Sequence, residues 1–137
     1  MTPLLRHAFR AIFALAVLAG PVRAAEPLAE HLWVSRPLII FADTPLDPNF
    51  PRQLAELERQ KDALAERDVV IITDTDPGAS RSERSALRKM LRPHGFTVIL
   101  IGKDGEIALR RPVVVTADDI TRQVDRMHNR LQEMGRP

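Results

Sequence analysis

The sequence contains no cysteine among its 137 residues, and this absence excludes several kinds of chemistry. Disulfide bonds, thiolate catalysis, CxxC redox chemistry and cysteine-ligated zinc or iron–sulfur sites all require a thiol. A strong charge of one sign is also missing, because 20 lysines and arginines face 18 aspartates and glutamates. The charged fraction of 28% and the apolar fraction of 45% are typical of a chain that forms a core, and the length fits one domain.

A hydrophobic run long enough to cross a bilayer is absent as well. The apolar run near the N-terminus covers residues 11–22, which are 12 positions, whereas a membrane helix needs about 20. Arg6 and Arg10 precede this run, and small residues up to Ala24 follow it. This order is typical of a signal peptide over residues 1–24. We therefore expect a periplasmic or secreted protein with no transmembrane segment after signal cleavage.

Removal of residues 1–24 changes the charge balance of the protein. The segment holds three arginines and no acidic residue, so cleavage changes the net charge from +2 to −1. Export also separates the protein from nucleic acid. We therefore expect no nucleic-acid partner, because such binding depends on an excess of basic charge.

The remaining chain is predicted to contain a lead-in segment, residues 25–36, and one domain, residues 37–137. Apolar runs predict strands over residues 37–42, 68–73, 96–101 and 106–111. The first three runs are continuous and predict burial on both faces, while the last alternates and predicts an edge strand. Apolar spacing and capping patterns predict helices over residues 53–67, 80–91 and 116–134.

The order of these elements predicts an α/β fold. A strand, a helix and a second strand at the start of the domain form a βαβ unit with parallel strands. Asp104-Gly105, between the last two strands, predicts a tight hairpin. The resulting order, βαβ-α-ββα, with a mixed sheet of about four strands flanked by helices, is that of the thioredoxin-like fold.

Four stretches carry a resemblance to a known family. They are 33–41 (WVSRPLIIF), 66–70 (ERDVV), 96–105 (FTVILIGKDG) and 125–134 (DRMHNRLQEM). Together they resemble the bacterial thioredoxin-like domain-of-unknown-function family that is shared with vertebrate extracellular coiled-coil-domain and sushi-repeat-containing matrix proteins. The resemblance implies a thioredoxin-like fold and an exported location, without an established activity. It marks residues whose role is unknown: Trp33, Arg36, Lys103, Asp104, Gly105, Arg130 and Glu133.

Some positions depart from what these resemblances imply. The loop after the first strand, where thioredoxins carry CxxC, covers residues 42–47 and has no cysteine, so we expect no thiol–disulfide exchange. His128 and Asn129 stand where the family ending has Pro and Met, and this departure predicts that the final helix runs on without a break. Trp33 is expected to pack against the sheet.

Three carboxylates follow the first two predicted strands. They are Asp43, Asp74 and Asp76. Because ligands of α/β sheets bind beyond the carboxyl ends of the strands, these side chains predict a ligand site for a divalent cation or for acid–base catalysis. The alternative is that they cap turns, since Asp76 precedes Pro-Gly and Asp43 begins a proline-rich loop.

Four arginines recur at helical spacing within the second predicted helix. They are Arg81, Arg84, Arg88 and Arg92. They predict a basic stripe that binds an anionic polymer or lipid headgroups, with an affinity that falls as salt rises. The alternative is a solvated helix face without a ligand.

Three functional hypotheses remain open at this point. The leading one is a non-catalytic, non-redox module without a cofactor that binds an unknown protein or small ligand. The second is a metal- or carboxylate-dependent enzyme that uses Asp43, Asp74 and Asp76. The third is a structural envelope or matrix-adhesion protein that relies on the basic stripe. Converging carboxylates beyond the first two strands would favour the enzyme.

Overall fold

The computed structural model describes residues 26–82 and 84–135, so the predicted signal segment lies outside the described residues. Four strands form one sheet in the order β2-β1-β3-β4. They are β1 (Arg36–Phe41), β2 (Val69–Asp74), β3 (Thr97–Ile101) and β4 (Ile107–Arg111). β2 is parallel to β1, whereas β3 is antiparallel to both β1 and β4. The predicted mixed sheet of four strands, with a hairpin before β4, is confirmed.

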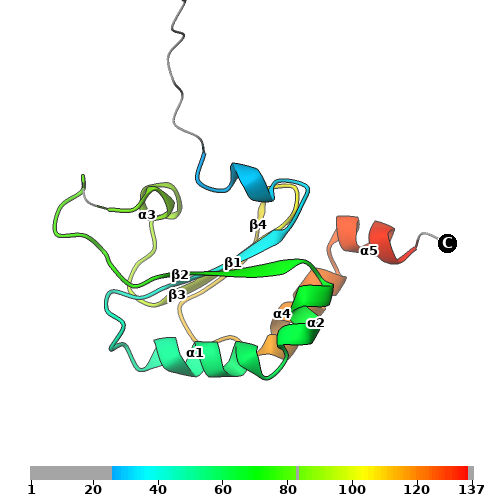
Figure 1. The fold of residues 1–137 in the computed structure, drawn as a ribbon, viewed down its shortest axis with the longest axis horizontal. Coiled ribbons are helices and arrows are strands. Elements are labelled where there is room, and N and C mark those ends of the chain that lie inside the picture. Colours follow the sequence, from blue (N-terminus) through cyan, green and yellow to red (C-terminus); the bar gives the residue numbers. More distant parts are fainter. Residues whose placement is uncertain (1–25, 83, 136–137) are drawn as a thin grey trace, which may run out of the picture.

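Helices cover both faces of this sheet. They are η1 (Ala29–His31), α1 (Asn49–Glu58), α2 (Lys61–Glu66), α3 (Ala86–Leu91), α4 (Ala117–Asp125) and α5 (His128–Met134). α1, α2 and α4 lie on one side of the sheet, and α3 and η1 lie on the other (Figure 1). Within the described residues, no helix is long and apolar enough to span a membrane.

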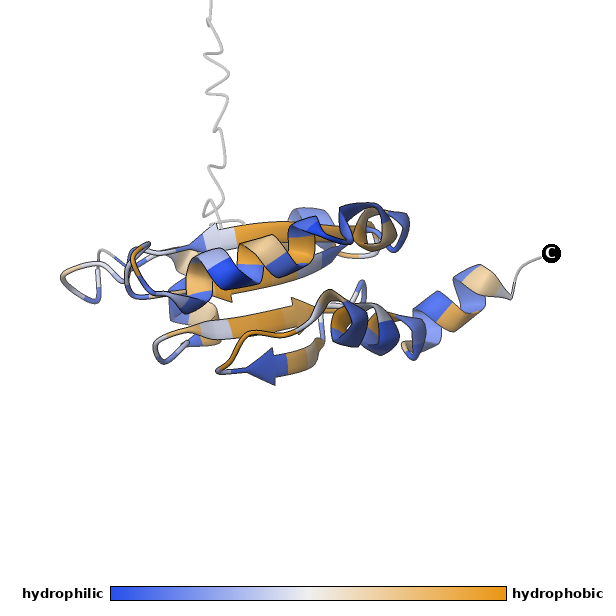
Figure 2. Cartoon of the chain, turned by 90° about the horizontal axis from the view of Figure 1, so that it is seen from below, coloured by the Kyte–Doolittle hydropathy of each residue, from blue (hydrophilic) through white to orange (hydrophobic). Residues whose placement is uncertain are grey.

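The core has two parts because successive side chains of a strand point to opposite faces. One part joins Leu38 and Ile40 of β1 to apolar side chains of α1, α2 and α4. The other joins Ile39 and Phe41 to Leu91 of α3 and to neighbours on β3. β1 is buried along its whole length since it lies between two strands and beneath helices on both sides. Figure 2 shows strands that are largely apolar and helices in which hydrophilic and apolar residues alternate.

Two helices that the sequence predicts as continuous are broken in the structure. The predicted helix over 53–67 is divided into α1 and α2, because Gln60 leaves the helical region and donates its side-chain amide to Asp118 on α4. The predicted helix over 116–134 is divided at Met127, which has extended backbone, so the expectation of an unbroken final helix is wrong. The apolar spacing alone could not show either break.

Burial also differs from prediction at two places. β2 is predicted to be buried on both faces, but it lies at the edge of the sheet, and Val70 and Ile71 are partly exposed. Trp33 is predicted to pack against the sheet, but 67% of it is exposed and its φ angle is +61°. Sheet order decides the exposure of β2, and hydropathy does not encode sheet order.

Candidate anion-binding site

Arg88 joins α3 to the carboxyl ends of β1 and β2. The side chain is buried, and its guanidinium donates to the carbonyl oxygen of Ala42 at 2.6 Å and to that of Asp74 at 3.0 Å. It also donates to Asp74 Oδ1 at 2.9 Å and lies over the ring of Phe41. Ser85, the N-cap of α3, donates its hydroxyl to Asp74 Oδ2 and accepts from the backbone of Arg88. Arg88 and Ser85 therefore anchor α3 to the two strands.

The carboxylate of Asp74 is held in its charged form by these contacts. Burial by itself raises the pKa of Asp74, but the hydrogen bonds from Ser85 and Arg88 outweigh this effect and lower the pKa below its ordinary value. Both carboxylate oxygens are engaged, since Oδ1 accepts from Arg88 and from the backbone of Asp76 and Oδ2 accepts from Ser85. Asp74 acts here as the counterion of a buried arginine.

Two of the three predicted carboxylates lie beside the guanidinium of Arg88, and the third caps a turn. Asp43 Oδ1 lies 3.6 Å from Arg88, Asp74 pairs with Arg88 directly, and Asp76 accepts from the backbone of Gly78 in a turn. Within the described ranges, no group of three or more histidine or acidic side chains is arranged to hold a metal ion. The turn role that the sequence offered as the alternative is present at Asp76.

A pocket of about 900 Å³ lies beside α3 and next to these carboxylates. Its ionisable lining consists of Asp43, Arg81, Arg84, Arg88, Lys89, Arg92 and His94. Among the described residues of this lining, five side chains are lysine or arginine and one, that of Asp43, is acidic. The electrostatic potential inside the pocket is therefore positive.

The four arginines of the predicted stripe meet in this pocket, but they do not form a stripe on one helix. The helix predicted over 80–91 starts only at Ala86, with Ser85 as its N-cap, so Arg81 and Arg84 precede it. Arg92 follows α3 with a left-handed backbone, φ +49°. The prediction of a basic stripe along one helix is therefore wrong, because Arg88 is buried and the other three arginines flank the helix.

Three guanidinium groups in the lining lack a partner within the part of the chain that the structure describes. Arg81, Arg84 and Arg92 have exposed side chains without a hydrogen bond or ion pair to any described residue. Lys89 donates to the carbonyl oxygen of Ser82 at 3.1 Å and keeps its charge uncompensated. Guanidinium groups bind phosphate, sulfate and carboxylate groups through paired hydrogen bonds. The arrangement suits a ligand with several such groups.

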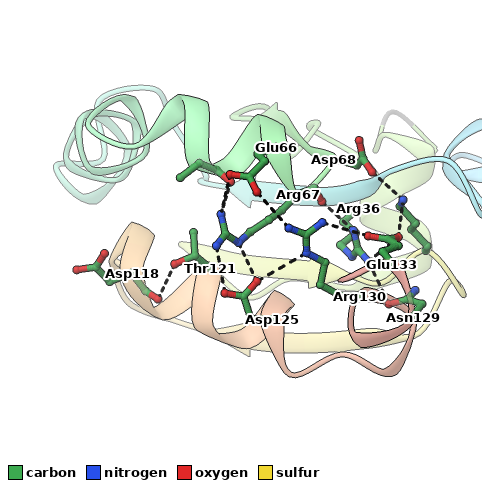
Figure 3. A network of polar contacts seen from close by, with 12 residues as sticks. Arg36, Glu66, Arg67, Asp68, Asp118, Thr121, Asp125, Asn129, Arg130 and Glu133 are labelled. Atoms are coloured by element: carbon green, nitrogen blue, oxygen red, sulfur yellow. Dashed lines mark hydrogen bonds and ion pairs between the residues drawn. The ribbon is translucent and has the colours of Figure 1, made fainter. Parts of the chain in front are cut away.

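A second polar cluster lies at the opposite end of β1 and explains several of the residues that the family resemblance marks (Figure 3). Arg36 is fully buried and donates to the carbonyl oxygen of Arg67 at 2.8 Å, to Asn129 at 3.1 Å and to Glu133 at 3.2 Å. Lys103 Nζ donates to the same oxygen of Glu133 at 2.8 Å. These bonds attach α5 to the sheet. They explain why a new helix begins at His128 although no proline stands there.

Further ion pairs extend this cluster. Arg67 donates two hydrogen bonds to Asp125, at 2.9 and 3.1 Å, and these bonds lower the pKa of Asp125. Arg130 lies 3.4 Å from both Glu66 and Glu133. No apolar residue of α5 is buried, so polar contacts hold this helix in place. Sequence reasoning missed Arg67 and Asp125 as members of this cluster, because no local spacing links them.

The remaining marked residues have simpler roles. Asp104 and Gly105 form the turn between β3 and β4, where Gly105 has φ +84° and Asp104 accepts from the backbone of Glu106. Trp33 is exposed beside this turn and donates its backbone N–H to the carbonyl oxygen of Lys103 at 2.7 Å.

The sheet order β2-β1-β3-β4 with helices on both faces defines a thioredoxin-like fold. Two solved structures with this fold are similar to the chain. The reduced 2-Cys peroxiredoxin of Plasmodium vivax is 14% identical, with a TM-score of 0.57 over 77% of this chain and 84% of that chain. Thioredoxin peroxidase I of Plasmodium yoelii is 16% identical, with a TM-score of 0.52 over 77% and 79%. At this low identity the similarity shows a shared fold alone.

The sequence family is narrower than this fold. Residues 27–133 match the family described as a domain of unknown function, DUF4174, and the chain belongs to this family. No curated protein matches the sequence. The expectation of a thioredoxin-like domain of unknown function is confirmed.

Proposed function

We propose that the protein is an exported, non-redox binding module that holds a polyanionic ligand in the basic pocket beside α3. One observation carries the proposal: Arg81, Arg84 and Arg92 converge on a single pocket and have no partner among the described residues. Most other arginines of the described chain bind a carboxylate, an amide or a carbonyl oxygen. The unpaired cations are therefore concentrated where an anion would supply the missing contacts.

The chemistry of the pocket supports a polyanion rather than a single small ion. The unpaired arginines come from the loop before α3 and from the turn after it, so one small anion would leave part of the charge unsatisfied. The guanidinium of Arg88 is paired with Asp74, so Arg88 lines the site but is not free to bind the ligand. The lack of cysteine supports a non-redox role, and the pattern of residues 1–24 supports export.

The test is a calorimetric titration of the purified protein with sodium tripolyphosphate at low and at physiological salt. The triple variant R81Q/R84Q/R92Q removes the unpaired guanidiniums. Exposed ion pairs contribute about 0.2–1 kcal/mol each, so the Kd should rise by roughly three- to a hundredfold. The affinity of the native protein should also fall as salt rises.

The matched control is R52Q/R122Q/R126Q, which removes three exposed arginines outside the pocket and changes the net charge equally. It should bind tripolyphosphate nearly as well as the native protein. If both triple variants lose the same affinity, the binding depends on net charge, and the pocket is not the site.

A further inference from the structure

A groove of about 440 Å³ lies on the same face of the sheet as the basic pocket. Met90 and Leu91 of α3 form one wall, η1 and the residues around it form another, and the β3–β4 hairpin closes the third side. α3 therefore contributes different side chains to two separate sites. The charged residues Arg88, Lys89 and Arg92 face the basic pocket, whereas Met90 and Leu91 face the groove.

The walls of this groove are apolar and accessible. Leu32, Met90 and Ile107 line it, and each is close to half exposed. Trp33 and Val34 follow Leu32 directly and are more exposed still. A bound apolar side chain would remove this surface from water, and each Å² of apolar surface that is buried contributes about 25 cal/mol.

The ionisable residues that line the groove are Glu26, Glu106 and His31, and His31 is engaged by Ser35 and Glu30. Glu26 and Glu106 are exposed and have no side-chain hydrogen bond or ion pair to any described residue. No lysine or arginine is part of the lining that the structure describes. An apolar groove with two unpaired carboxylates at its rim complements a ligand that joins an apolar group to a cation.

The groove is held open by backbone contacts. The N–H of Trp33 donates to the carbonyl oxygen of Lys103 at 2.7 Å, which fixes the lead-in segment against the hairpin. Gly105 has φ +84°, and a Cβ atom there would stand 3.4 Å from Cδ1 of Leu32. Glycine thus allows the turn its left-handed backbone where Leu32 approaches it. A preformed site of this kind loses little entropy on binding.

The neighbouring strand favours a peptide as the occupant. β4 begins at Ile107 in the groove and is the last strand of the sheet, so one side of its backbone has no strand partner. The Ala108 carbonyl oxygen accepts from the side chain of Gln123 at 3.3 Å. An extended peptide adds to such an edge through main-chain hydrogen bonds, and pockets beside the edge select its side chains.

We propose that this groove binds an extended segment of a partner protein in which an apolar side chain stands beside lysine or arginine. The apolar side chain lies against Leu32, Met90 and Ile107, and the cation pairs with Glu26 or Glu106. The proposal is independent of the polyanion site, because the two pockets share no lining residue.

The test uses two capped peptides, acetyl-Lys-Leu-Val-Leu-Lys-amide and acetyl-Glu-Leu-Val-Leu-Glu-amide, titrated into the isotopically labelled protein and followed by amide chemical shifts. The lysine peptide should shift signals of residues 26–34 and 101–108 and should bind at least about tenfold more tightly than the glutamate peptide. Dodecyltrimethylammonium provides the same apolar and cationic chemistry without a peptide backbone. Equal affinities of the two peptides, or binding of the detergent cation as tight as that of the lysine peptide, would overturn the proposal.

Variants locate the binding. I107R places a cation in the groove and should abolish binding of the lysine peptide, whereas V113R makes the same kind of change at an exposed apolar residue outside the groove and should leave it intact. E26Q/E106Q changes only exposed carboxylates, which leaves folding unaffected, and should remove the preference for lysine over glutamate. R81Q/R84Q/R92Q should bind the lysine peptide like the native protein. A preference that persists in E26Q/E106Q would contradict the assigned charge contacts.

Discussion

Glu133→Gln is the substitution that most sharply probes how α5 is attached. The carboxylate of Glu133 accepts from Lys103 at 2.8 Å and from the fully buried Arg36 at 3.2 Å. Burial by itself raises the pKa of Glu133, but the hydrogen bond from Lys103 and the charge of Arg36 outweigh it and lower the pKa from 4.5 to about 2. Glutamine keeps the shape and an acceptor oxygen but removes the negative charge.

The magnitude follows from this pKa. A group whose pKa is lowered in the folded state adds stability above its ordinary pKa and loses it as pH falls toward the folded value. Lowering a pKa from 4.5 to about 2 corresponds to about 3 kcal/mol at neutral pH, since a tenfold change in the ionisation constant is worth about 1.4 kcal/mol. The side chain is 29% exposed, and solvent screening reduces the expected loss to about 2 kcal/mol.

The assay is urea unfolding followed by far-ultraviolet circular dichroism at neutral pH and at about pH 3. At neutral pH, E133Q should be about 2 kcal/mol less stable than the native protein. The difference in unfolding free energy between E133Q and the native protein should shrink to about half near pH 3, because the native protein then loses part of the contribution of its charged carboxylate.

The control is Glu58→Gln, which breaks an exposed ion pair between α1 and Lys61 of α2. It should change the free energy of unfolding by less than about 0.5 kcal/mol. A loss in E133Q no larger than that in E58Q, or a gap that does not change with pH, would refute the reasoning.

Three further predictions concern the basic pocket and the C-terminal break. Arg88→Gln should cost about 3–5 kcal/mol in unfolding experiments because it leaves Asp74 buried without its counterion, whereas Arg84→Gln should cost almost nothing. Millimolar Mg²⁺ or Ca²⁺ should leave the Tm unchanged, because Arg88 already neutralises Asp74. A rise in Tm that Asp74→Asn abolishes would support the hypothesis of a metal-dependent enzyme. His128→Pro should leave stability unchanged or raise it by up to about 1 kcal/mol, because His128 is the first residue of α5; a continuous helix would instead lose about 3 kcal/mol.

The strands and their order along the chain could be predicted because each strand is a short apolar run bounded by turn residues. The hairpin at Asp104-Gly105 is a local signal, and the structure places the turn there. The exposure of β2 could not be predicted, since it depends on which strand occupies the edge. Helix breaks at Gln60 and Met127 likewise depend on side-chain contacts with distant elements rather than on apolar spacing.

The sequence predicted which arginines share the candidate site, but it did not predict how the site is built. The spacing of the arginines indicated a common surface, and they do line one pocket. Arg88, however, is buried and donates a hydrogen bond to Asp74, which stands fourteen positions earlier in the sequence. No periodicity in the sequence indicates that these two residues form a pair. The contacts of Arg36 with Asn129 and Glu133 span more than ninety residues of sequence. The family resemblance could therefore mark Arg36 and Glu133, but it could not show that their side chains are hydrogen bonded.

The most direct test of the polyanion site is to observe the arginine side chains themselves. Nε–Hε signals of the labelled protein can be followed by nuclear magnetic resonance during titration with sodium tripolyphosphate. The account predicts that Arg81, Arg84 and Arg92 shift in a saturable manner, while the buried Arg36 and the exposed Arg52 do not. Shifts of equal size at Arg52, or no saturable shift at the three pocket arginines, would contradict it.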